Sequence, residues 1–81
     1  MRVRVLFFSV LRDATGAAEV ELELPAGATV GGLLEEVFSR WPRLREWDRS
    51  LLLAVDHHYT TRDAALTEGC EVAVMPPVQG G

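Results

Sequence analysis

One apolar stripe at helical spacing, in a chain otherwise patterned as strands, limits the folds open to this 81-residue sequence. Thr29 is a good helix N-cap, and Pro42 ends the stripe because the residue before a proline avoids the α region. We therefore expect one main helix over residues 30–40, lying across a sheet. Its apolar residues recur at intervals of three and four, the spacing of one buried helix face: Val30, Leu33, Leu34, Val37, Phe38 and Trp41.

Alternation of side chains predicts two strands before this helix. A first strand over residues 2–10 places Val3, Val5 and Phe7 on one face, and a connector over 11–16, with one helical turn closed by Gly16, follows it. The opposite face of that strand mixes charge with apolar groups, namely Arg2, Arg4, Leu6, Phe8 and Val10. A second strand carries Val20, Leu22 and Leu24 inward, with glutamates outward.

Three more strands are expected after the helix. An irregular connection or short helix over 43–49 leads to a strand with Leu51, Leu53 and Val55 inward, ending near Asp56. A turn at His57-His58, a short strand over 59–61 and a loop over 63–69 precede the last strand, residues 70–75. That strand is central, being the most apolar. The order predicts one α+β domain over residues 1–81, a β-grasp with a mixed sheet, parallel first and last strands, and the helix on one face.

The sheet face away from the helix is predicted to bind a partner. An exposed apolar patch larger than a solitary domain needs marks such a surface. Alternation gathers these residues there: Leu6, Phe8, Leu52, Ala54, Tyr59 and Met75.

Composition narrows the classes of function. The net charge of −4 argues against a nucleic-acid partner, which needs clustered positive charge. Cys70 has no second cysteine to pair with, and no apolar run of ~20 residues predicts a membrane segment, so we expect a cytoplasmic chain. A metal site at His57-His58 is not predicted, because no further ligands follow at useful spacing. A phosphate-binding loop at Gly31-Gly32 is not predicted either, because the required sequence pattern is missing. Cys70 is interpreted as a core residue.

The carboxyl-terminal stretch is where the chemistry is expected. Pro76 and Pro77 remove backbone donors and stop the strand, so residues 76–81 should protrude as a tail of ~20 Å when extended. Val78 and Gln79 lead to Gly80 and Gly81, whose backbone can enter a channel too narrow for a Cβ. The reactive group would be the α-carboxylate of Gly81, and Pro76 to Gly80 would insert into a partner.

The ending Met-Pro-Pro-Val-Gln-Gly-Gly resembles that of the small-subunit family of molybdopterin synthase, the MoaD type of ubiquitin-like sulfur carrier. The resemblance extends to Val5-Leu6-Phe7-Phe8, Leu53-Ala54-Val55 and Leu66-Thr67-Glu68-Gly69. Asp56 departs from the asparagine frequent in the family, and Cys70 from an acidic residue.

The resemblance implies a role without a bound cofactor. An activating enzyme like ubiquitin E1 (MoeB-like) would use ATP to adenylate Gly81, and a sulfur donor such as a cysteine desulfurase would supply the thiocarboxylate. The carrier would dock on a MoaE-like large synthase subunit, which holds the catalytic side chains, and pass its sulfur to cyclic pyranopterin monophosphate.

Three alternatives stay open on the sequence alone. The same tail could serve thiamine synthesis, tRNA thiolation or another sulfur pathway. A ubiquitin-like modifier would be joined to lysines of target proteins, although all eight basic residues here are arginine, so this chain offers no lysine for a polymer. A plain interaction domain would tolerate loss of Gly81.

Overall fold

The computed structural model describes residues 1–77. Along this part of the chain the elements are, in order, β1 (Arg2–Phe7), α1 (Val10–Thr15), β2 (Glu19–Glu23), α2 (Val30–Arg40), the 3₁₀ helix η1 (Pro42–Ser50), β3 (Leu52–Val55), β4 (His58–Tyr59) and β5 (Glu71–Met75). The predicted main helix and the predicted strand order are both confirmed.

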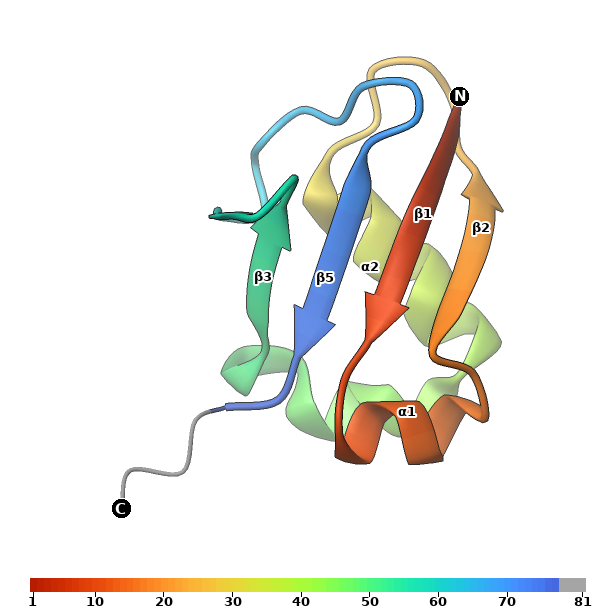
Figure 1. Ribbon diagram of the computed structural model, residues 1–81, viewed down its shortest axis with the longest axis vertical. Coiled ribbons are helices and arrows are strands. Elements are labelled where there is room, and N and C mark those ends of the chain that lie inside the picture. The colour runs from red at the N-terminus through yellow and green to blue at the C-terminus, as the bar shows by residue number, and fades with distance from the viewer. Residues whose placement is uncertain (78–81) are drawn as a thin grey trace.

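The five strands form one mixed sheet in the order β2-β1-β5-β3-β4 (Figure 1). β1 and β5 run parallel at its centre, with Val5 opposite Val72, and the other neighbouring pairs are antiparallel. The expected β-grasp architecture is therefore confirmed, including the central place of the last strand.

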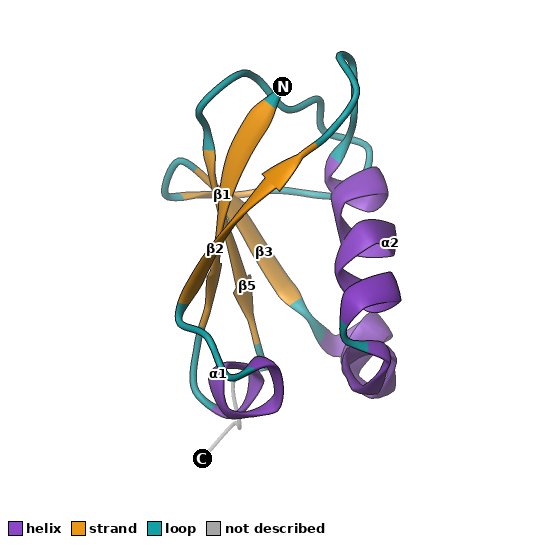
Figure 2. Cartoon of the chain, turned by 90° about the vertical axis from the view of Figure 1, so that its right-hand side faces the viewer, coloured by secondary structure: helices purple, strands orange, loops and turns teal. Residues whose placement is uncertain are grey.

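Helix α2 covers one face of the sheet, and the core lies between the two layers (Figure 2). Its apolar stripe is buried, with Phe38 only 1% exposed. Trp41 packs its ring edge-on against Phe7, with centroids 5.3 Å apart, which fits the core role expected of it. Leu66 and Cys70 are also buried, as predicted.

The first strand is shorter than predicted. β1 ends at Phe7, and Ser9 takes a positive φ of 58° that turns the chain into α1. Val10 begins that helix, so the expectation that it lies on the outer sheet face is wrong. The alternation of apolar and polar residues continues beyond Phe7, although the backbone turns at Ser9. The residue pattern alone therefore could not show where the strand ends.

The turn between β3 and β4 falls one residue earlier than predicted. Asp56 and His57 both have positive φ, 47° and 71°, as in a two-residue hairpin loop, and β4 starts at His58. The Asp56 carboxylate accepts a hydrogen bond from the backbone N–H of Glu71 at 3.0 Å. Asp56 therefore ties the hairpin to the central strand, a role that either an aspartate or an asparagine oxygen can fill.

The amino end of α2 is closed by protein groups. Thr29 Oγ1 accepts from the Gly32 N–H at 3.2 Å, as its predicted cap role requires. The N–H groups of Val30 and Gly31 donate to the carbonyls of Ala64 and Arg62, at 3.0 and 2.8 Å. Because these donors are already paired, Gly31 and Gly32 do not form a phosphate cradle.

Replacing Thr29 by Ala should lower the free energy of unfolding by about 1 kcal/mol, because the Gly32 N–H loses its acceptor. Urea unfolding of the variant measures this loss. Thr67→Ala, at an exposed loop position, is the control and should unfold with the parent. A Thr29 variant as stable as that control would show that the cap contributes nothing.

Candidate docking face and tail

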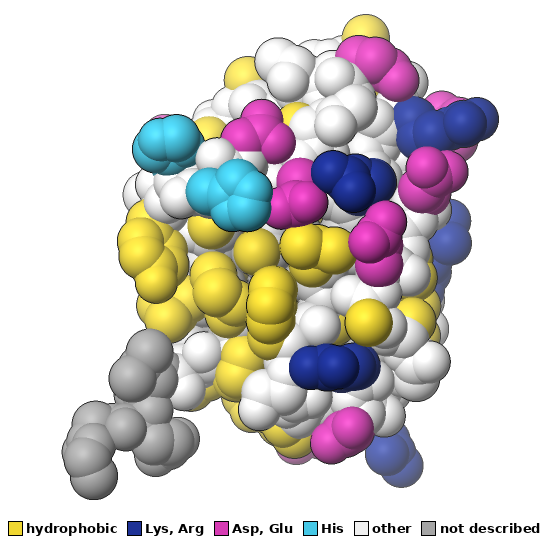
Figure 3. Space-filling view, viewed as in Figure 1, with side chains coloured by type: hydrophobic (Ala, Val, Ile, Leu, Met, Phe, Trp, Pro, Cys, Tyr) yellow, Lys and Arg dark blue, Asp and Glu magenta, His cyan; other side chains and the backbone are white. Residues whose placement is uncertain are grey.

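The sheet face opposite α2 carries an open apolar depression of about 260 Å³. Figure 3 shows apolar side chains gathered on this face, bordered along one side by histidine and charged groups. The depression is lined by residues of β1, β3, β4 and β5 and their flanks: Leu6, Phe8, Ala54, His57, Tyr59, Glu71, Ala73 and Met75. We call this set the docking face.

Most of the predicted partner-binding residues lie together here. Phe8 and Tyr59 are the prominent ones, 40% and 77% exposed, and Leu6 and Met75 are half-buried. Leu52 pairs with Met75 at the end of the face where β5 stops, although it does not line the depression itself.

Ala54 is the exception in exposure. We expected it on the surface, but it is only 7% exposed. Its short side chain lies in the strand between Tyr59 and Ala73, its partners on either side. Ala54 therefore forms the floor of the depression, and its larger neighbours form the contact surface.

A row of charges runs along one edge of the docking face and was missed by the sequence analysis. The Arg4 guanidinium lies 3.2 Å from a Glu71 carboxylate oxygen and 3.9 Å from one of Glu19. His57 Nε2 lies 3.6 Å from the other Glu71 oxygen. Arg4, which shares this face with apolar side chains, is thus paired with glutamates on both neighbouring strands. Alternation along β5 was the available signal, because it puts Glu71, Ala73 and Met75 on one side.

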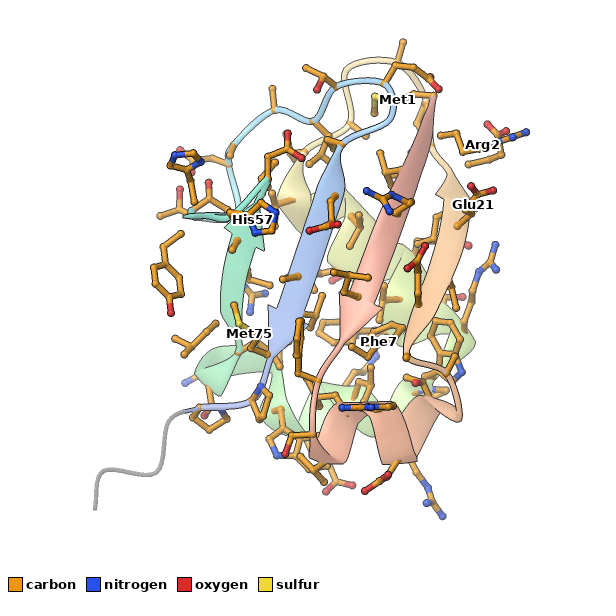
Figure 4. All side chains as sticks on the ribbon, in the orientation of Figure 1. Met1, Arg2, Phe7, Glu21, His57 and Met75 are labelled. Atoms are coloured by element: carbon orange, nitrogen blue, oxygen red, sulfur yellow. The ribbon has the colours of Figure 1, made fainter. Side chains whose placement is uncertain are left out.

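The chain leaves the sheet beside this face. Pairing between β3 and β5 ends at Leu52 and Met75, the second of which is labelled in Figure 4. Pro76 and Pro77 follow, both half-buried. Since proline offers no N–H for a further ladder bond, the strand stops where the sequence predicted. The remaining predicted tail residues, Val78, Gln79, Gly80 and Gly81, lie outside the described residues.

Residues 1–77 contain neither a cluster of metal-binding side chains nor a membrane-spanning helix. Within this range, no three His, Cys, Asp or Glu side chains come together as a metal-binding group. Nor does any helix in the same range have the length and apolarity needed to cross a bilayer.

The chain is similar in sequence to small proteins described as sulfur carriers. The profile of the ThiS family matches residues 5–81. The chain is 37% identical to the molybdopterin synthase sulfur carrier subunit of Escherichia coli K12, over 98% of this chain and 99% of that protein. It is 33% identical to the protein of the same description in Arabidopsis thaliana, over 100% and 84%.

Solved structures of similar proteins have the same fold as this chain. A protein described as subunit 1 of a molybdopterin converting factor, from Pyrococcus furiosus, superposes with a TM-score of 0.88 at 35% identity, over 96% of this chain and 99% of that one. A chain of the BexX/CysO complex of Amycolatopsis orientalis superposes with a TM-score of 0.78 at 25% identity, over 98% and 99%.

Proposed function

Because the chain belongs to the ThiS family, we propose that it is the sulfur carrier subunit of a molybdopterin synthase. Relatives described by that name match nearly end to end, at 33% and 37% identity. The structural observation that carries the proposal is the apolar docking face beside the point where β5 ends at Met75. A partner that covers this face stands next to the emerging tail.

The proposed chemistry takes place at the Gly81 α-carboxylate. A carboxylate oxygen attacks the α-phosphate of ATP on an E1-like activating enzyme, giving an acyl adenylate and pyrophosphate. The terminal sulfur of a donor persulfide, such as that of a cysteine desulfurase, then displaces AMP and forms an acyl disulfide. A second thiol attacks the donor's own sulfur, forming a disulfide with it and releasing the C-terminal thiocarboxylate. That sulfur is passed to cyclic pyranopterin monophosphate, and water regenerates the carboxylate.

The catalytic side chains in this scheme belong to the partners. The docking face supplies apolar contact area and one row of paired charges, which suit binding rather than proton transfer. Two unhindered glycines leave the terminal carbonyl open to attack in a narrow channel. The carrier's own contribution is to dock and to present the tail.

We propose the large synthase subunit and the activating enzyme as successive occupants of the docking face. The similarity to a chain of the BexX/CysO complex supports a carrier that works bound to a second protein. An exposed apolar surface used in turn by two partners also explains why it is left uncovered in the free chain.

The experiment that tests this proposal measures two quantities in parallel, the intact mass of the carrier and the amount of molybdopterin formed. After incubation with activating enzyme, ATP and sulfur donor, the intact mass should rise by the replacement of one oxygen by sulfur. That form should convert the pyranopterin precursor only when the large subunit is added. Conversion by the unmodified carboxylate form would contradict the proposal, and sulfur transfer to a thiamine precursor alone would assign the chain to that pathway.

Replacing Phe8 by Arg should weaken binding to both the large subunit and the activating enzyme by roughly a hundredfold, since hot-spot aromatics contribute about 2–4 kcal/mol. Titration calorimetry with each purified partner measures the change. The fold should persist, because the side chain is 40% exposed.

Val10→Arg is the matched control for that variant. Val10 is also 40% exposed, but it lies on α1 and does not line the docking face. The Val10→Arg variant should bind the large subunit and the activating enzyme with affinities close to those of the parent chain. Equal losses in both variants would show that added charge, and not the docking face, is responsible.

A further inference from the structure

A second depression adjoins the docking face on the β2 side. It has a volume of about 210 Å³ and is lined by Leu6, Phe7, Phe8, Arg12, Ala18 and Glu19. Leu6 and Phe8 belong to both depressions, and Phe8 is exposed between them. The two depressions are therefore one continuous surface divided by an aromatic ridge.

The second depression is lined by one arginine, Arg12, which differs in its partners from the arginines of the neighbouring strand β1. Arg2 and Arg4, on β1, each have glutamate partners, at 3.4 Å to Glu23 and 3.2 Å to Glu71. Within residues 1–77, by contrast, no carboxylate forms an ion pair with Arg12, whose side chain is exposed. Glu19 also lines the depression, but it lies 3.9 Å from Arg4.

The backbone around Arg12 is held firmly enough to present that cation. Its carbonyl accepts the Gly16 N–H at 2.8 Å, which closes α1, and its neighbour Leu11 is fully buried. On the other wall, the Ala18 carbonyl accepts the Phe7 N–H at 2.9 Å, so β1 and the start of β2 are joined there. Both walls of the depression are thus built on paired backbone.

We propose that this second depression receives a carboxylate side chain of the large synthase subunit, which pairs with Arg12. The partner segment crosses Phe8, placing apolar groups in the first depression and the carboxylate in the second. This inference rests on the proposed function. An arginine that forms no ion pair within residues 1–77, beside an apolar ridge that already marks a binding face, favours an acidic group on the protein that covers it.

The same geometry predicts the register of the complex. An apolar face alone permits several orientations, whereas an off-centre ion pair favours one of them. With its carboxylate held beside Arg12, the partner lies across β1 and β5 and reaches the exit of the tail at Met75.

The test measures the Kd of the purified large subunit for the full chain and its variants. Arg12→Glu should weaken binding about tenfold at low salt, with most of the loss in the association rate. The deficit should shrink as salt is raised, because exposed charges are screened. Arg12→Lys keeps the charge and should stay within a few fold of the parent.

A steric variant probes the same depression without changing charge. Ala18→Leu fills it while leaving the backbone hydrogen bond to Phe7 available, and should also weaken binding by about tenfold. Two controls make the same changes elsewhere. Arg40→Glu lies on α2, over the opposite sheet face, and Ala26→Leu lies in the exposed turn before α2; both should stay within about twofold.

The outcomes separate this inference from the proposed function. If the parent chain binds the large subunit and Arg12→Glu and Ala18→Leu bind equally well, the carboxylate site is wrong and the carrier role stands. If these variants lose only thiocarboxylate formation by the activating enzyme, the assigned occupant is wrong. If the parent chain itself does not bind the large subunit, the proposed function fails and this inference with it.

Discussion

Deletion of Gly81 should abolish sulfur transfer while leaving the free energy of unfolding unchanged. The deletion moves the α-carboxylate back by one residue, about 3.3–3.6 Å in an extended chain, and out of reach of the partner's active site. Stability should not change, because the described core ends at Val74. Product formation with the large subunit and a urea unfolding curve measure the two effects.

Two further tail variants sharpen this prediction. Adding one residue after Gly81 also displaces the carboxylate and should abolish activity. Gly81→Ala keeps the position but adds a methyl group, which should slow adenylation or entry into a narrow channel. All three variants should bind the large subunit nearly as well as the parent, if docking depends on the sheet face.

A carrier that still yields product without Gly81 would overturn the sulfur-carrier assignment. The interaction-domain alternative would then take its place. A large loss of affinity in the deletion variant, in contrast, would place docking energy in the tail and weaken the role given to Phe8. The two measurements thus separate chemistry at the carboxylate from binding by the face.

Replacing Phe38 by Ala should lower the free energy of unfolding by about 3–5 kcal/mol, the range for buried aromatic side chains. The ring is 1% exposed and lies in the core between α2 and the sheet. Its removal leaves a cavity and also removes the surface over which the Arg45 guanidinium sits, 5.2 Å from the ring centroid. The loss is a large share of the stability of a small domain.

Tyr59→Ala is the control for size and aromaticity. The side chain is 77% exposed on the docking face, so its loss should change the free energy of unfolding by no more than about 0.5 kcal/mol. The same variant should nevertheless weaken partner binding. If Phe38→Ala unfolded at the same urea concentration as Tyr59→Ala, the burial of the helix stripe would be contradicted.

The sequence predicted an element correctly where a residue that caps or interrupts secondary structure stands at its end. Thr29 and Pro42 bound the main helix because one caps it and the other forbids its continuation, and α2 runs Val30–Arg40 as predicted. Pro76 likewise follows the end of β5. The inward faces of β1 and β5 followed from alternation, since burial on one side of a sheet leaves a period of two.

Boundaries without such marks were predicted less well. Nothing in the residue pattern shows that Ser9 turns the chain at φ 58°, so Val10 was assigned to the wrong element. Ala54 was assigned to the correct face with the wrong exposure, because its burial depends on Tyr59 and Ala73 in strands brought beside it by the fold.

Three features could be predicted from the sequence: one helix carries an apolar stripe, two prolines stop the last strand, and the stretch ends in two glycines. These properties depend on near neighbours along the chain. Other features depend on how the elements pack: Arg4 is paired while Arg12 forms no ion pair within residues 1–77, and Phe8 stands between two depressions. Such relations join residues of different strands and helices, and only the packing of those elements sets which side chains meet.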